Sequence, residues 1–264
     1  MHRLEVNPDL HQFLDHVRQG LLKDPKKLSS RYFYDDEGSR IFQKIMQLPE
    51  YYLTSAEDEI LRQQSTAIIQ AINYTKPFNV VELGAGDGAK TLHLLRALSE
   101  HDLPFDFIPI DISQRAIDDL ERNMHEELPQ LSIKPVVGDY FQVLDKLVSF
   151  DRPNLVLFLG SNIGNFETRA ATDMFKRFYS TLNVGDHLLV GFDLKKDPNL
   201  IRNAYFDSKG VTKAFNLNLL QRINRELGGD FDLKQFDFYS FYDPVSGEVR
   251  SFIVSLINQK VKIS

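Results

Sequence analysis

The chain of 264 residues contains no cysteine, which excludes disulfides, thiolate catalysis and cysteine-based zinc sites. Its seven histidines show no H-E-x-x-H pattern or comparable ligand spacing, so the sequence predicts no metal site. The first residues lack an apolar signal core, because Glu5 and Asp9 interrupt it. The longest apolar runs fall far below the roughly 20 residues that span a bilayer. We therefore expect a soluble, cytoplasmic protein that does not enter a membrane.

An excess of positive charge is also missing. The 31 basic residues face 37 acidic ones, for a formal net charge of -6, so a nucleic-acid partner is not expected. The basic residues between Lys23 and Arg31 surround Pro25 and are interpreted as a solvated loop. Hydrophobic residues make up 42% of the chain, enough for a sizeable core.

The middle of the chain alternates strands with helices. Short apolar or β-branched runs predict five strands, at 78–83, 105–113, 134–141, 154–166 and 185–194, and the fourth of these runs into a polar loop. Between them, residues 89–100 carry leucines on one helical face, and Ser113 is positioned to cap a helix that reaches Leu128. Continuous apolar strands are typical of a parallel sheet covered on both faces, so the predicted fold class is α/β and doubly wound.

The two ends of the chain have a different pattern. Residues 1–75 look helical with loops, and 196–264 combine helices with a predicted hairpin around Pro244 and Gly247. We predict that 76–195 forms the central sheet domain and that the two flanking parts form a second, α+β domain.

The sharpest local motif follows the first predicted strand. It reads ELGAGDGAK, with Gly84, Gly86 and Gly88 alternating after Glu82. Glycines at the carboxyl end of a strand let the backbone approach a ligand closely. The spacing differs from the dinucleotide fingerprint G-x-G-x-x-G, and the carboxylate of Asp87 would repel a pyrophosphate. The loop resembles motif I of the S-adenosylmethionine-dependent methyltransferases; a dinucleotide site and a plain glycine turn are the alternatives.

Acidic residues end the next two predicted strands. Asp111 can accept hydrogen bonds from both ribose hydroxyls, although an Asx turn would also explain it. Asp139 can accept the adenine amino group while Tyr140 packs on the ring, and the alternative is a turn acid beside a core tyrosine.

A lysine opens the helix after the glycine loop. The cation of Lys90 opposes the helix dipole there, so we expect an anion beside it, such as the carboxylate of a methionine moiety; a solvated lysine is the alternative. The polar loop GSNIGNF at the end of the fourth strand contains Ser161, Asn162, Gly164 and Asn165. The side-chain amide oxygens of the two asparagines can hold an amine. A turn capped by asparagines is the alternative there.

Longer segments resemble one family. The segment RYFYDDEGSRIFQKIMQLPEYYLTSAEDEIL (31–61), the motifs ELGAGDGAKT, FIPIDIS, VLFLGSNIGNF and GFDLKKD, and the run 202–233 are similar to the histidine Nα-methyltransferases of ergothioneine biosynthesis. The resemblance covers nearly the whole chain. It implies a Rossmann-like class I methyltransferase sheet with an α+β substrate domain, and it extends to fungal relatives that methylate an indole-derived amino acid.

The resemblance also implies roles for individual residues. Contacts to S-adenosylmethionine are implied for Tyr34, Gly84, Gly86, Lys90, Asp111, Asp139 and Tyr140. Contacts to the amino-acid substrate are implied for Tyr51, Asn165 and Tyr205, with Asn165 nearest the amino group and with Asn165 and Tyr51 as the catalytic residues. For the tyrosines, core or interface packing is the alternative.

The resemblance predicts a methyl transfer without metal, to the amino group of an amino acid, most simply L-histidine. The enzyme's task is to place a neutral amine in line with the methyl group. Members of the family continue well past the position where this chain ends, so the chain looks C-terminally truncated. The alternatives are a non-catalytic S-adenosylmethionine-binding or partner-binding module and an NAD-type oxidoreductase. We expect a monomer with a small-molecule substrate.

Overall fold

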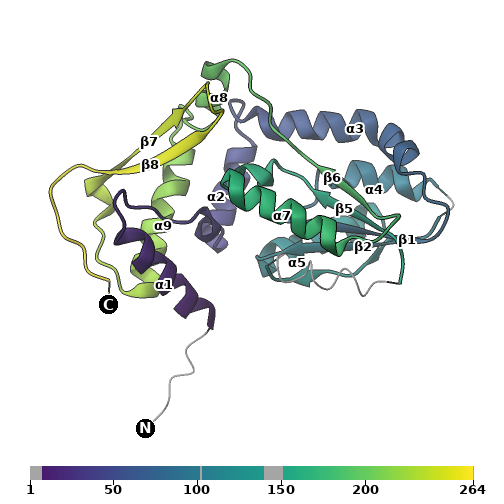
Figure 1. The fold of residues 1–264 in the computed structure, drawn as a ribbon, viewed down its shortest axis with the longest axis horizontal. Coiled ribbons are helices and arrows are strands. Elements are labelled where there is room, and N and C mark those ends of the chain that lie inside the picture. The colour runs from purple at the N-terminus through teal and green to yellow at the C-terminus, as the bar shows by residue number, and fades with distance from the viewer. Residues whose placement is uncertain (1–7, 102, 140–150, 264) are drawn as a thin grey trace, which may run out of the picture. The chain divides into compact units, whose positions relative to one another are not determined.

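The computed structural model describes residues 8–101, 103–139 and 151–263 (Figure 1). It divides into two compact units. The core unit is Tyr52–Leu194, and the terminal unit combines Met1–Tyr51 with Lys195–Ser264. The predicted segment 1–75 is therefore split, because α3 (Tyr52–Ile72) packs on α4 (Thr91–Ser99) and shares its apolar cluster.

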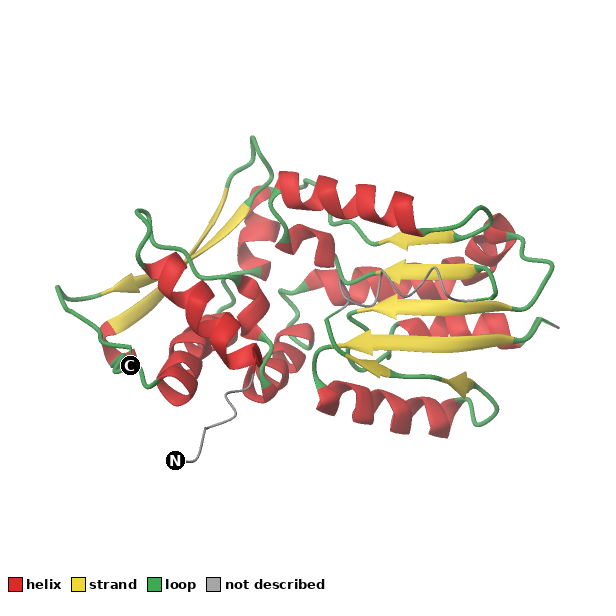
Figure 2. Cartoon of the chain, turned by 60° about the horizontal axis from the view of Figure 1, so that its bottom comes forward, coloured by secondary structure: helices red, strands yellow, loops and turns green. Residues whose placement is uncertain are grey.

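The core unit is built on a parallel sheet. Its strands are β1 (Phe78–Leu83), β2 (Phe105–Asp111), β3 (Ser132–Ile133), β4 (Val136–Val137), β5 (Asn154–Phe158) and β6 (His187–Val190). The order is β3-β2-β1-β5-β6, and β4 also pairs with β2. Every pairing in this sheet is parallel, and the long arrows of the sheet in Figure 2 point the same way. The predicted α/β, doubly wound fold is confirmed.

Helices cover both faces of this sheet. Along β1, Val80 belongs to an apolar cluster with α3, α4 and α5 (Gln114–Glu127), whereas the next residue, Val81, belongs to a cluster with α7 (Thr168–Thr181). This alternation follows from the two-residue period of a strand. Because both faces are buried, the strands read as continuous apolar runs.

Two local predictions can be compared with the elements. Ser113 caps α5 as expected, since its Oγ accepts the amide of Ala116 at 3.2 Å. The third predicted strand, 134–141, is wrong in extent: two short strands, β3 and β4, pair with successive parts of β2. Pro135 lies between them and has no amide hydrogen to contribute to a ladder.

The terminal unit contains helices and a hairpin. The helices are α1 (Pro8–Leu21), η1 (Ser30–Phe33), α2 (Asp36–Met46), α8 (Pro198–Ala204), α9 (Val211–Leu227) and η4 (Leu233–Gln235). The predicted hairpin is confirmed as the antiparallel pair β7 (Phe236–Tyr242) and β8 (Val249–Ser255). The apolar core of the terminal unit joins α1 to α9 through Phe13, Val17 and Ile223. Within the part of the chain that the structure describes, no helix has the length and apolar character needed to cross a membrane.

Candidate functional site

The predicted ligand residues of the core unit lie at the carboxyl edge of the sheet. Parallel strands end at one edge, and the register places Leu83 of β1 beside Ile110 of β2, and Asp111 beside Val137 of β4. The loops that follow β1, β2, β4 and β5 therefore emerge together. Ligands of doubly wound sheets bind at this edge, where the chain order reverses.

The glycine loop after β1 is shaped by backbone conformations that favour glycine. Gly84, Gly86 and Gly88 have φ angles of 73°, 57° and 69°. A Cβ on Gly88 would come within 2.6 Å of Met124 Cε, so this glycine lets the loop lie on α5. A Cβ on Gly86 would meet nothing within 4 Å, so the backbone there faces open space that a ligand can approach.

Asp111 is held in place by backbone amides. Its Oδ2 accepts the amide of Gly86 at 3.0 Å, and its Oδ1 accepts the amide of Ser113 at 2.9 Å. Burial raises the pKa of the Asp111 carboxyl, and the amides of Ser113 and Gly86 only partly offset this. The contact with Ser113 is the Asx-type geometry considered above. Because each carboxylate oxygen has two acceptor sites, the same oxygens can still accept ribose hydroxyls.

Asp139 follows β4 beside Asp111. The amide of Gly138 donates to the carbonyl of Asp111 at 2.8 Å, which ties the two strand ends together. Asp139 is partly buried, and its contact with an adenine group stays a prediction. Tyr140, predicted to pack on the same ring, lies outside the described residues.

Lys90, at the start of α4, has an anionic neighbour within the chain. The anion that we expected was the carboxylate of a methionine moiety, and that contact stays a prediction. The neighbour is Glu57 of α3, which forms an ion pair with the Lys90 ammonium. The other oxygen of Glu57 accepts the amide of Gly160, after β5, at 2.7 Å. Sequence reasoning missed Glu57, because it lies 33 residues before Lys90 in a helix with no local binding motif.

The acid of the glycine motif, Glu82, is buried at the end of β1. Its Oε1 accepts the hydroxyl of Thr91 at 2.6 Å, and Oε2 has no hydrogen-bond partner within the described ranges. Burial raises the pKa of Glu82 to about 8; Thr91 and the charge of Lys90 oppose this only in part. The carboxyl is therefore largely neutral at pH 7.

The loop after β5 turns sharply before η3 (Asn162–Asn165). Gly160 and Ser161 adopt left-handed conformations, with φ angles of 70° and 52°. The side-chain nitrogen Nδ2 of Asn162 lies 3.0 Å from the place that a Cβ on Gly84 would occupy, so this loop meets the glycine loop. Asn165 ends η3 and is exposed, which leaves its amide accessible. Its contact with a substrate amine stays a prediction.

The three tyrosines predicted to bind ligands lie together in the terminal unit. The rings of Tyr51 and Tyr205 meet edge to face, with centroids 6.0 Å apart. Phe42 joins Tyr51 to Tyr34 at centroid distances of 6.1 and 5.5 Å. Phe215 also contacts Tyr34. The tyrosines do pack in an aromatic cluster, so the packing alternative holds for Tyr51, which is 9% exposed; their ligand contacts stay predictions.

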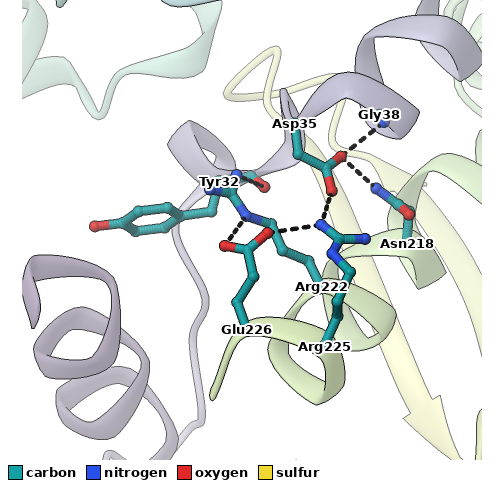
Figure 3. Close-up of polar contacts among 7 residues, drawn as sticks. All are labelled: Tyr32, Asp35, Gly38, Asn218, Arg222, Arg225 and Glu226. Atoms are coloured by element: carbon teal, nitrogen blue, oxygen red, sulfur yellow. Dashed lines mark hydrogen bonds and ion pairs between the residues drawn. The ribbon is translucent and has the colours of Figure 1, made fainter. Parts of the chain in front are cut away.

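A polar network fixes the segment that presents Tyr34 (Figure 3). Asp35 caps α2 by accepting the amide of Gly38 at 2.7 Å, and it also accepts Asn218 at 2.8 Å and Arg225 at 2.6 Å, both of α9. Burial opposes the charge on Asp35, but Arg225, Gly38 and Asn218 outweigh it and hold the pKa of its carboxyl below the usual value. The backbone next to Tyr34 is thus attached to α9.

The core unit's donors and acceptors suit S-adenosylmethionine better than a dinucleotide. The loop offers an open backbone at Gly86, an oriented carboxylate at Asp111 and a cation at Lys90. These groups complement a nucleoside with an amino-acid tail. Asp87 Oδ1 accepts the amide of Ala89 at 3.2 Å, so a carboxylate lies at the position where a pyrophosphate would need neutral donors. Within the described ranges no three histidine or acidic residues gather in a way that could hold a metal ion.

Comparisons with known proteins agree with this chemistry. Residues 13–264 match the family model described as "Histidine-specific methyltransferase, SAM-dependent". The chain is 38% identical over 248 residues to the histidine N-alpha-methyltransferase of Mycolicibacterium smegmatis, and 35% identical over 247 residues to that of Mycobacterium tuberculosis. Each alignment covers 94% of this chain and 76% of the relative. Ergothioneine biosynthesis protein 1 of Schizosaccharomyces pombe is 31% identical over 86% of the chain and 30% of its own length.

Proposed function

Because the chain belongs to the family of histidine-specific, S-adenosylmethionine-dependent methyltransferases, we propose that it methylates the α-amino group of L-histidine. Membership of the family makes the chain a methyltransferase with S-adenosylmethionine as its cofactor. The choice of substrate and of atom is the proposal. It is supported by the names of the relatives, which are histidine N-alpha-methyltransferases, at up to 38% identity over 94% of the chain.

The cofactor supplies a methyl group on a sulfonium, so the leaving group is already activated. The chain's own residues then have to hold and orient both molecules. We assign Asp111 to the ribose hydroxyls, Asp139 to the adenine amino group and Lys90 to the carboxylate. The observation that carries this assignment is the geometry of Asp111, which is fixed by the amides of Gly86 and Ser113 at the open glycine loop.

The amine must be neutral to attack, since an ammonium has no lone pair. Partial desolvation and a nearby sulfonium both favour the neutral form. We assign Asn165 to this amine, because an uncharged amide oxygen accepts an N–H without stabilising the ammonium as a carboxylate would. Tyr51 and Tyr205 are assigned to the amino acid, and their faces can stabilise cationic groups by about 0.5–2 kcal/mol each.

A substrate comparison tests the proposal. Purified protein with S-adenosylmethionine is incubated with L-histidine, Nα-acetyl-histidine and a panel of other amino acids, and products are measured by mass spectrometry. Methylation of histidine but not of Nα-acetyl-histidine is expected. A methylated acetyl derivative would place the reaction on the imidazole, and no transfer to any amino acid would favour a non-catalytic module. The same spectra show whether methylation stops at one group or proceeds to the trimethylammonium.

A binding comparison tests the cofactor against the remaining alternative. S-adenosylhomocysteine should bind in a calorimeter, whereas NAD should not. The reverse result would favour an oxidoreductase. The cytoplasmic location and the monomeric state both stay predictions. Size-exclusion chromatography with light scattering tests the oligomeric state.

A further inference from the structure

The carboxylate of Glu57 lies where three loops of the core unit meet. Glu57 comes from the first turns of α3, yet its two oxygens contact residues that follow β1 and β5. One oxygen pairs with Lys90, and the other accepts the amide of Gly160 at 2.7 Å. The side chains of Glu57 and Lys90 are 14% and 24% exposed, so the pair is mostly shielded from water.

A glycine at the end of β6 makes room for this carboxylate. Gly191 donates its amide to the carbonyl of Phe158, which places it beside the end of β5. A Cβ on Gly191 would come within 2.5 Å of Glu57 Oε1, closer than real Cβ contacts. Gly191 does not adopt a left-handed backbone conformation. A glycine is therefore needed at this position for the space that it leaves, and not for its backbone conformation. The absence of a side chain at Gly191 therefore leaves the space that the Glu57 carboxylate occupies.

The pair of charges matches the amino-acid end of the cofactor. That end is a zwitterion, with one carboxylate and one ammonium. A lysine ammonium has three donors, so Lys90 can keep Glu57 and still donate to a carboxylate. The negative charge of Glu57 compensates Lys90 beside an ammonium and a sulfonium, which an isolated cation would repel.

We propose that Glu57 is a positioning residue that acts through Lys90 to set the affinity for the amino-acid end of S-adenosylmethionine. This inference rests on the role of Lys90 in the proposed function. Glu57 fixes the lysine by holding it against the Gly160 turn, so the ammonium is oriented before the ligand arrives. Orientation in advance lowers the cost of ordering a long side chain on binding.

The test compares two ligands that share an adenosyl group. S-adenosylhomocysteine carries the amino-acid end, and 5′-methylthioadenosine lacks it. By titration calorimetry, Glu57→Gln should bind S-adenosylhomocysteine about tenfold more weakly or worse, in line with the loss of a charged hydrogen bond, and should bind 5′-methylthioadenosine as the unsubstituted protein does. Asp58→Asn is the matched control: Asp58 is the neighbouring acid on α3 and contacts His93 instead, so both affinities should stay unchanged.

Two further variants show whether Glu57 acts through Lys90. In a Lys90→Gln background, Glu57→Gln should cause no further loss of affinity for S-adenosylhomocysteine, because the group that it positions is gone. Gly191→Ala should reproduce the Glu57→Gln result by displacing the carboxylate. It also keeps the proposal testable if Glu57→Gln does not fold.

Three results would overturn the proposal. They are equal weakening for both ligands, no change in Glu57→Gln, and losses that add fully in the double variant. If the unsubstituted protein itself did not bind S-adenosylhomocysteine, the assignment of the cofactor site would fail first.

Discussion

At the scale of single residues, Glu82 shows how burial changes the chemistry of an acidic side chain. Glu82 is the next-to-last residue of β1, just before the glycine loop, and it is 4% exposed. One oxygen has the Thr91 hydroxyl, and the charges of Glu57 and Asp111 add to the effect of burial on its pKa. A neutral carboxyl adds no negative charge near Asp111, the residue that we propose as the acceptor for the ribose hydroxyls.

Replacement of Glu82 by Gln tests this state. The folded pKa of about 8 exceeds the ordinary 4.5, so the stability that the carboxyl contributes is complete below about pH 4.5 and is lost as the pH rises towards 8. The free energy of unfolding of Glu82→Gln should therefore rise relative to the unsubstituted protein between about pH 5 and pH 8, at up to about 1.4 kcal/mol per pH unit.

Urea unfolding across this pH range measures the difference. Glu100→Gln, which changes an exposed acid at the end of α4, serves as the control and should follow the unsubstituted protein. A difference between Glu82→Gln and the unsubstituted protein that does not change with pH would show that Glu82 is ionised in the folded state.

At the scale of elements, the segment η1–α2 depends on α9 for its position. Asp35 combines a helix cap with two contacts to α9, and Arg222 of α9 donates to the carbonyl of Tyr32 at 3.0 Å (Figure 3). The side chain of Asp35 is 8% exposed, so these bonds are shielded from solvent. The segment contains Tyr34, which makes the network a support for that predicted ligand contact.

Replacement of Asp35 by Asn should destabilise the protein by about 1–3 kcal/mol, because the amide loses the charge that Arg225 and the helix start favour. The pKa of Asp35 is lowered, so its contribution is present above the ordinary 3.8 and is lost as the pH falls below it. The destabilisation should be seen near neutral pH and shrink in acid. Asp36→Asn, at the exposed neighbouring acid, is the control for urea unfolding. Equal losses in both variants would contradict a special role for Asp35.

At the scale of the whole molecule, the predicted ligand residues divide between the two units. The core unit contains Gly84, Gly86, Lys90, Asp111, Asp139 and Asn165, and the terminal unit contains Tyr34, Tyr51 and Tyr205. Each unit has its own apolar core. The residues proposed to bind the nucleoside thus lie mainly in the core unit, and two of the three proposed to bind the amino acid lie in the terminal unit.

Binding of S-adenosylhomocysteine should stabilise the chain as a linked equilibrium. At a concentration of about 100 times its Kd, the free energy of unfolding of the core unit should rise by about 2.7 kcal/mol. Hydrogen exchange should slow at the amides of the glycine loop. At the same ligand concentration Asp111→Asn should reduce this gain, whereas Asp118→Asn, at an exposed position of α5, should leave it intact. No gain in the unsubstituted protein would contradict the cofactor assignment.

Much of the core unit was determined by the sequence itself. The apolar run 78–83 has the same bounds as β1, and Ser113 caps α5. In the terminal unit, the hairpin around Pro244 and Gly247 forms as predicted. The glycine motif also has the left-handed backbone that its spacing suggested. These features depend on neighbours in the chain: side-chain period, turn chemistry and capping all act within a few residues.

Tertiary structure alone decided which distant groups meet. Glu57 and Lys90 lie 33 positions apart, and Asp35 and Arg225 lie 190 positions apart, yet both are ion pairs. The aromatic contact of Tyr51 with Tyr205 and the neutral state of Glu82 also required the fold. Such contacts depend on how the chain crosses between strands and on what covers each group, and no local pattern encodes either.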